Sequence, residues 1–138
     1  MSVFLGKWIG YYENVVSDKL CDDIISYTVE SKELSPSKYA THDGESSTSS
    51  ERVYMDDVWF RFGEDKYYEE MRTHTLKVLE MYKKVHNVVC TRLTDFRVNR
   101  YDVGGFMSEH IDNIHHSHGQ QYGYPHLSVL LFLSEDYE

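Results

Sequence analysis

The chain is predicted to fold as one α+β domain, with helices first and strands afterwards. Two segments with helical periodicity come early in the sequence, and extended segments rich in β-branched and aromatic residues dominate its second half. With 138 residues, 41% of them hydrophobic and 27% charged, the chain has the length and balance of a single globular domain. We therefore expect one domain over residues 1–138, with helical support over about 1–90 and the first core strands over about 91–138.

The first predicted helix follows Ser17-Asp18, a pair suited to capping the start of a helix. Beyond it, side chains that can be buried recur at helical spacing and so share one face that can pack on a sheet: Leu20, Cys21, Ile24, Ile25, Thr28 and Val29. The next segment, 31–51, contains Pro36, Gly44 and a run of Ser and Thr, a composition that favours a loop.

A strand and a longer helix are predicted next. Val53 to Phe62 combines β-branched and aromatic residues, which favours an extended segment, and Gly63 ends it. The second helix should run from about Asp65 to His86, where helix-forming residues carry apolar side chains along the segment.

Three further extended segments complete the predicted sheet. Cys90 to Tyr101 alternates between apolar and polar residues, as a half-buried strand does. A turn at Gly104-Gly105 should lead into a strand over Phe106 to Ile111. His126 to Leu133 is almost continuously apolar, as expected for a strand covered on both faces.

The charge and hydropathy of the chain exclude two classes of partner. The net charge is −9, from 23 acidic against 14 basic residues, and such a field repels phosphate backbones. No segment approaches the roughly 20 apolar residues of a membrane span. We therefore expect neither nucleic acid nor membrane as a partner, and we interpret the spaced cations as solvated or ion-paired side chains: Lys83, Lys84, Arg92, Arg97 and Arg100.

The two cysteines and the N-terminus indicate a compartment. Cys21 and Cys90 stand far apart without a paired or metal-type spacing, which suits two buried free thiols in a reducing environment. The N-terminal segment interrupts its apolar residues with Gly6 and Lys7 and so never builds a signal-peptide core. We expect a cytoplasmic protein.

A possible metal site lies at Ser108-Glu109-His110-Ile111-Asp112. On an extended strand, side chains at i and i+2 point the same way, so His110 and Asp112 can present an imidazole and a carboxylate to one ion. Completed by a second His, such a pair forms the facial triad of non-haem Fe(II) oxygenases, which leaves coordination positions open. The pattern alone is common, and an ordinary half-buried histidine followed by a turn aspartate would look the same.

The residues around this pair carry a family resemblance. Arg97-Val-Asn-Arg-Tyr-Asp-Val-Gly-Gly-Phe-Met-Ser-Glu-His-Ile-Asp112 resembles the entry to the double-stranded β-helix of the prolyl 4-hydroxylase-like 2-oxoglutarate oxygenases. His126-Leu-Ser-Val-Leu-Leu-Phe-Leu-Ser-Glu-Asp-Tyr-Glu138 looks like the next strand of that family. The similarity covers about residues 95 to 138 and looks closest to members found in bacteria and their phages.

The resemblance implies a fold and an activity. The N-terminal helices would pack on a partial double-stranded β-helix, a jelly-roll or cupin-like core. The chain would be an Fe(II)- and 2-oxoglutarate-dependent dioxygenase that hydroxylates a protein or peptide side chain such as proline, with ascorbate as a further cofactor. His110 and Asp112 would be metal ligands and catalytic residues, and Tyr101 would donate its hydroxyl to 2-oxoglutarate. A phage-encoded member would act in the host cytoplasm.

The chain also departs from the family pattern. Phe132 stands where some members have a Tyr that contacts the co-substrate. The family's second metal-binding His and its carboxylate-binding Arg are expected beyond Glu138, so we expect the 138 residues alone to be inactive or severely impaired. As an alternative, a third ligand could come from the loop after Asp112, which contains His115, His116 and His118.

Two other functions remain open at the level of sequence. A strand over His126 to Leu133 close to Glu138 would leave an exposed edge and an uncovered apolar face. The chain could therefore be a non-catalytic interaction module, completed by a partner or by self-association through this edge. Zn or Ni held by the His-rich loop is the remaining alternative.

Overall fold

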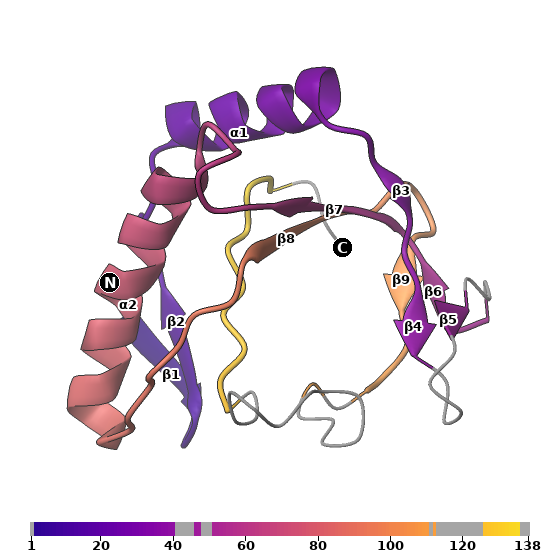
Figure 1. The fold of residues 1–138 in the computed structure, drawn as a ribbon. Helices are drawn as coiled ribbons and strands as arrows, with labels where there is room; N and C mark the ends of the chain where they lie inside the picture. Colours follow the sequence, from indigo (N-terminus) through magenta and orange to yellow (C-terminus); the bar gives the residue numbers. More distant parts are fainter. Residues whose placement is uncertain (1, 41–45, 48–50, 111, 113–125, 136–138) are drawn as a thin grey trace.

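The computed structural model describes residues 2–40, 46–47, 51–110, 112 and 126–135. Helices and small antiparallel sheets share this part of the chain, so the predicted α+β class is confirmed (Figure 1). The elements are β1 (Ser2–Gly6), β2 (Ile9–Tyr12), α1 (Asp18–Ser31), β3 (Ser35–Pro36), β4 (Tyr39–Ala40), β5 (Ser46–Ser47), β6 (Val53–Tyr54), β7 (Asp56–Phe60), α2 (Tyr68–His86), β8 (Phe96–Arg100) and β9 (Phe106–Met107).

The largest sheet has the strand order β3-β7-β8 and is antiparallel throughout. Its longest pairing joins β7 to β8, from Asp56 opposite Arg100 to Phe60 opposite Phe96. Three two-stranded pairs accompany it in the described residues: β1 with β2, β4 with β5, and β6 with β9. The pairing of β6 with β9 matters most for the site, because β9 leads directly to His110.

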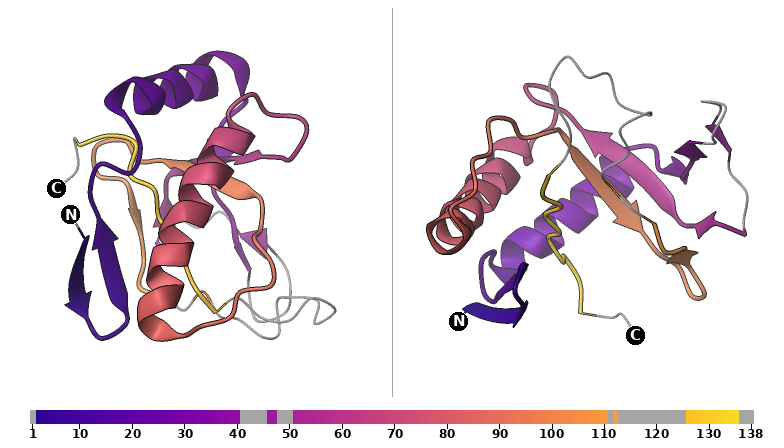
Figure 2. Two further views of the ribbon diagram at one scale, coloured as in Figure 1. Left: turned by 90° about the vertical axis from the view of Figure 1, so that its left-hand side faces the viewer. Right: turned by 90° about the horizontal axis from the view of Figure 1, so that it is seen from below.

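The core lies between the two helices and the β7–β8 pair. Figures 1 and 2 show α1 above the β7–β8 pair and α2 beside one end of it. Ile24 of α1 and Phe60 of β7 are fully buried, and they form one cluster with Tyr68 and Met71 of α2. Burying four such side chains is the main apolar contribution to stability in this part of the fold. Partly buried side chains surround the cluster: Leu20, Tyr27, Val58, Tyr67, Phe96, Val98 and Leu133.

Helix α1 confirms the helix predicted after Ser17. The Ser17 hydroxyl accepts a hydrogen bond from the Leu20 backbone N–H at 3.3 Å, which is the contact of an N-cap. Ile24 and Thr28 are the buried residues of this helix. Val29, which the spacing placed on the same face, is exposed instead.

Helix α2 confirms the second predicted helix but begins at Tyr68, three residues later than expected. The reason is Asp65, whose carboxylate accepts a hydrogen bond from the Arg61 backbone N–H at 2.6 Å. A short polar side chain that bonds a nearby backbone group favours a turn over a helix. The helix ends at His86, and Asn87 follows in the left-handed conformation.

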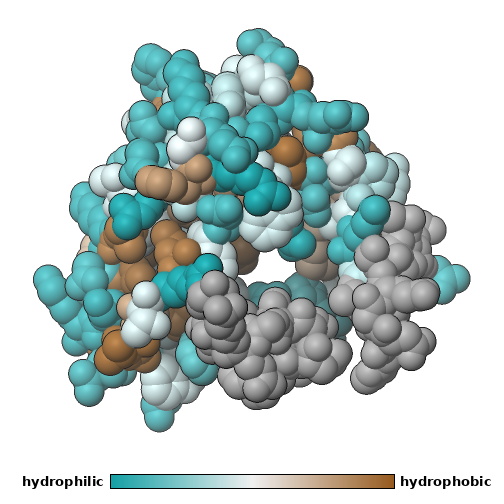
Figure 3. Space-filling model, in the orientation of Figure 1, coloured by the Kyte–Doolittle hydropathy of each residue, from teal (hydrophilic) through white to brown (hydrophobic). Residues whose placement is uncertain are grey.

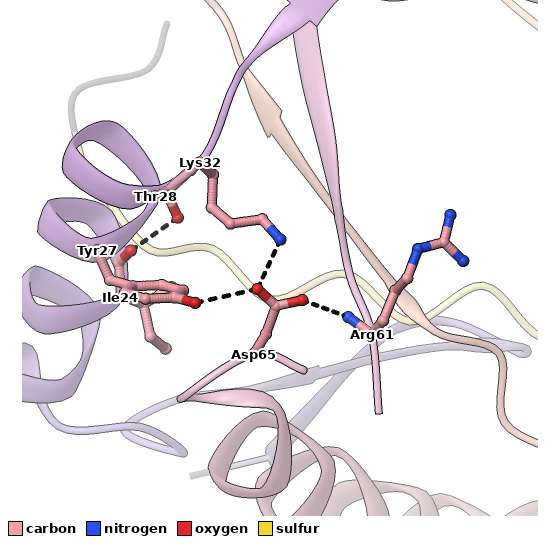
Figure 4. Close-up of polar contacts among 6 residues, drawn as sticks. All are labelled: Ile24, Tyr27, Thr28, Lys32, Arg61 and Asp65. Carbon is pink, nitrogen blue, oxygen red and sulfur yellow. Dashed lines mark hydrogen bonds and ion pairs between the residues drawn. The ribbon is translucent and has the colours of Figure 1, made fainter. Parts of the chain in front are cut away.

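Asp65 also joins three parts of the core (Figure 4). Besides the Arg61 N–H, its carboxylate accepts hydrogen bonds from the Tyr27 hydroxyl at 3.1 Å and from Lys32 Nζ at 2.6 Å. Burial raises the pKa of Asp65, but the hydrogen bonds from Lys32, Arg61 and Tyr27 outweigh burial and leave the pKa below its ordinary value. The carboxylate therefore fixes α1 to the turn that leads from β7 to α2.

Several predicted element positions are wrong. The order is not helices first, because the β1–β2 hairpin precedes α1, and the described residues between the helices contain five strands. The predicted loop over 31–51 contains β3, β4 and β5, and the predicted strand over Cys90 to Tyr101 is limited to β8. Short strands of two residues have no periodicity that a sequence pattern can detect.

The strand predicted over Phe106 to Ile111 is shorter than expected. Among its described residues, 106–110, only Phe106–Met107 pairs, with Tyr54 and Val53. One further hydrogen bond, from Ser108 N–H to the Arg52 carbonyl at 2.8 Å, closes the ladder. The ladder goes no further on this side, where Glu51 and Arg52, the residues before β6, form a turn.

The strand predicted over His126 to Leu133 is also wrong. These residues carry no strand ladder, and they are not covered on both faces. Leu127, Leu131 and Leu133 are half-buried, whereas Leu130 and Phe132 are 75% and 58% exposed. One side of this segment packs against the protein and the other faces solvent.

Neither helix in the described part of the chain has the length and apolar character needed to cross a membrane. Both cysteines are free, as predicted, although each is half-buried rather than buried.

Candidate metal centre

The segment that carries His110 is held in place by the turn before β9. Gly104 adopts a positive φ of 79°, and the Gly105 N–H donates to the Asp102 carbonyl at 2.7 Å. This turn reverses the chain from β8 into β9, as the two glycines predicted. Because β9 is then paired to β6, the residues after Met107 start from a fixed position.

The imidazole of His110 has an oxygen atom beside each ring nitrogen. Its Nδ1 donates to the Ser108 carbonyl at 2.8 Å. A carbonyl can only accept, so Nδ1 must carry a hydrogen. The other nitrogen, Nε2, lies 3.0 Å from Asp112 Oδ1. The predicted pair therefore does converge, although it does so beyond the end of β9 rather than on a strand.

The carboxylate of Asp112 is held from two sides. Oδ1 lies beside His110, and Oδ2 accepts a hydrogen bond from the Ser128 hydroxyl. Ser128 is 16 residues away in the sequence, so two distant segments meet at this carboxylate. The side chains of His110 and Asp112 are 43% and 55% exposed, which leaves both accessible to a ligand from solvent.

This arrangement fits a metal ion. With a hydrogen on Nδ1, the Nε2 lone pair of a neutral imidazole would face a carboxylate oxygen, which is repulsive unless a proton or a metal cation lies between them. Two ligand atoms that bind one ion at right angles, each at about 2.1 Å, lie about 3 Å apart. The observed separation of 3.0 Å is compatible with two ligands of one ion, and it is equally the distance of a direct hydrogen bond from a protonated Nε2.

The other predicted residues are not joined to this pair. Tyr101, expected at the co-substrate, follows β8 and is half-exposed, and no hydrogen bond within the described residues links it to His110 or Asp112. The loop histidines considered as a third ligand, His115, His116 and His118, lie outside the described residues. Among those described, no group of three or more His, Cys, Asp or Glu side chains could hold a metal.

Ser128 was not predicted as part of the site. The sequence placed it in a strand covered on both faces, where a hydroxyl has no particular role. Its contact depends on the approach of two segments that are distant in the sequence, and no local spacing could have indicated it.

The basic residues of β8 form ion pairs with β7, as the charge pattern predicted. Arg100 pairs with Asp56, directly opposite in the register, and Arg97 lies 4.0 Å from the diagonal Asp57. Cross-strand pairs of opposite charge stabilise such sheets modestly. These arginines are therefore part of the sheet surface.

Two hollows in the described surface are lined by residues other than His110 and Asp112. One of about 410 Å³ lies beside Trp59, Arg61 and Arg92, and one of about 200 Å³ lies beside Ser37, Met55 and Asp102. Figure 3 shows apolar side chains gathered over α2. The chemistry of the donor atoms, and not the size of a hollow, identifies the candidate site.

Comparisons of the chain with protein-family models, with curated proteins and with solved structures gave no match. The functional assignment therefore depends on the residues themselves.

Proposed function

We propose that His110 and Asp112 are two ligands of a mononuclear Fe(II) centre in a 2-oxoglutarate-dependent dioxygenase of the prolyl 4-hydroxylase-like type. The observation that carries the proposal is the 3.0 Å separation of His110 Nε2 from Asp112 Oδ1. The described strands would then belong to a jelly-roll core, with the helices packed outside it.

The hydrogen-bond pattern of His110 supports a role as a ligand. A metal-binding imidazole commonly donates its second N–H to a carbonyl or carboxylate, which fixes the tautomer and orients the ring. His110 makes this contact through Nδ1 with the Ser108 carbonyl. Its Nε2 would then have a lone pair available to bind an ion, beside the negative charge of Asp112.

Three residues of the chain and the ion each have a defined part in this proposal. Fe(II) with open coordination positions would supply the coupling of 2-oxoglutarate oxidation to hydroxylation of the substrate. His110 binds the ion through a neutral nitrogen, and Asp112 binds it through one oxygen and offsets one of its two positive charges. Tyr101 would donate its hydroxyl to 2-oxoglutarate. The substrate class proposed is a protein or peptide side chain such as proline, with ascorbate as a further cofactor.

The ligand assignment is tested by anaerobic Fe(II) titration of the 138-residue chain and of its His110→Ala and Asp112→Ala variants. Either substitution should raise the Kd for Fe(II) by at least about tenfold, because each removes a side chain that binds the ion directly. His74→Gln changes a histidine on α2 and serves as the matched control, with affinity unchanged. Equal Fe(II) binding by wild type and His110→Ala would end the proposal.

The reaction is tested on the polypeptide encoded by the whole reading frame that contains this sequence. Consumption of 2-oxoglutarate should require Fe(II) and should be lost in Asp112→Ala. The same measurement on the 138-residue chain shows whether these residues alone support turnover.

A second candidate function is a non-catalytic interaction module. The observation that favours it is the exposure of Val129, Leu130 and Phe132 on an extended segment without a strand ladder. Adjacent apolar side chains in solvent are typical of surfaces that bind a partner or a second copy. Light scattering after size exclusion tests self-association. A wild-type chain with the mass of a monomer, unchanged by Leu130→Asp, would argue against it.

A further inference from the structure

The two oxygens of the Asp112 carboxylate have different neighbours. Oδ1 lies 3.0 Å from His110 Nε2, while Oδ2 accepts a hydrogen bond from the Ser128 hydroxyl. A carboxylate without such a contact can turn about its side-chain bonds and bind an ion through one oxygen or through both. The contact with Ser128 occupies Oδ2 and leaves Oδ1 directed toward the imidazole.

The position of Ser128 is set by the packing of its neighbours. Along the segment 126–135, Leu127, Leu131 and Leu133 are half-buried, and Leu133 packs against the core cluster. Side chains alternate along an extended chain, so Ser128 projects from the side opposite to these leucines. The hydroxyl is therefore presented by a segment that is anchored in the core.

We propose that Ser128 is a positioning residue of the metal centre, which holds Asp112 so that only Oδ1 binds the ion. The inference rests on the proposed metal centre and concerns how its carboxylate ligand is oriented. Groups that hydrogen-bond to metal ligands fix the ligand geometry, and their loss commonly lowers metal affinity by about 10- to 100-fold.

The contact also links metal binding to the extended segment. An ion that binds Asp112 in this orientation favours the state in which Ser128 is docked, and by linkage the docked segment favours the ion to the same extent. Metal binding should therefore slow amide hydrogen exchange in residues 126–135 of the wild-type chain. The effect should be lost when the hydroxyl is removed.

The probe for this test is Co(II), added without oxygen to the 138-residue chain, because its visible spectrum reports coordination geometry. Ser128→Ala should raise the Kd for Co(II) by about 10- to 100-fold and change the visible bands. Ser128→Thr retains a hydroxyl and should restore both. Ser134→Ala, an exposed serine of the same segment, is the matched control and should behave as wild type.

A double-variant cycle separates positioning from a general structural role. In an Asp112→Ala background the carboxylate is absent, so Ser128→Ala should have no further effect on Co(II) binding or on hydrogen exchange. An effect of equal size in both backgrounds would overturn the inference. If positioning is the role, the metal-free wild type and the metal-free Ser128→Ala variant should unfold at the same temperature, since the Ser128 side chain is exposed.

The outcomes also distinguish this inference from the proposed function. If His110→Ala loses Co(II) while Ser128→Ala keeps the wild-type Kd and spectrum, the metal centre stands and the role of Ser128 is refuted. If His110→Ala binds Co(II) as well as wild type does, the metal centre itself is refuted, and the role of Ser128 with it.

Discussion

Lys32 Nζ lies 2.6 Å from Asp65 Oδ1, and this ion pair joins the residue after α1 to the turn before α2. The Asp65 side chain is only 2% exposed and that of Lys32 is 20% exposed, so water screens the pair little. The Tyr27 hydroxyl and the Arg61 N–H satisfy further lone pairs of the carboxylate. A buried charge with this many partners is costly to lose from one side only.

Asp65→Asn should lower the free energy of unfolding by about 2–4 kcal/mol, because it leaves the Lys32 ammonium without its counter-charge. Chemical denaturation measures the change. The matched control is Asp23→Asn, which removes the exposed ion pair with Lys19 at 2.6 Å and should leave stability unchanged. If the two substitutions had equal effects, the Asp65 network would have no special part in stability.

The same carboxylate predicts how stability depends on pH. The pKa of Asp65 is lowered in the folded protein, so the folded state binds fewer protons than the unfolded state does. Its contribution is fully present above the unfolded pKa of about 3.9 and is lost as pH falls through the folded pKa. Denaturation of wild type and Asp65→Asn between about pH 6 and pH 2 should show the stability difference shrinking toward acid. A difference that stays constant over this range would contradict the assignment.

The extended segment 126–135 should depend on its core-facing side for stability. Leu133→Ala should cost about 1–3 kcal/mol, because Leu133 packs against the buried cluster around Ile24 and Phe60. Leu130→Ala removes the same atoms from a side chain that is 75% exposed and should change the free energy of unfolding by less than about 0.5 kcal/mol. Similar losses from both leucines would mean that the outer side is covered as well.

The sequence predicted the elements whose signals are local. Ser17 and the spacing of Ile24 and Thr28 indicated α1, and the alternation before Tyr101 indicated the strand that includes β8. The apolar run ending at Leu133 was misleading, because hydrophobicity does not reveal whether a partner strand is present to form a ladder. The start of α2 was misplaced because the burial of Asp65 depends on contacts from α1.

The candidate site was predictable only within one short segment. The spacing of His110 and Asp112 placed both groups toward one point, and the structure brings them to 3.0 Å. Asp112 also accepts a hydrogen bond from Ser128, which lies 16 residues further along the sequence. No pattern of residue types encodes such a contact, because it results from where Leu133 and its neighbours pack in the core.

The turn before β9 should control both stability and metal affinity. A methyl group at Gly105 would lie 2.8 Å from the Asp102 carbonyl oxygen and 3.0 Å from that of Tyr54, and both are backbone atoms that cannot easily move. Gly105→Ala should therefore cost about 1–3 kcal/mol of stability and displace β9 from β6. Because β9 leads into His110, Co(II) affinity should fall as well.

The neighbouring Gly104 provides the control. Gly104 has a positive φ and open space around it, so Gly104→Asn should be tolerated, since Asn adopts that conformation readily. Denaturation and Co(II) titration of the two variants measure the contrast, and a Gly105→Ala protein with wild-type affinity would show that the site does not depend on this turn.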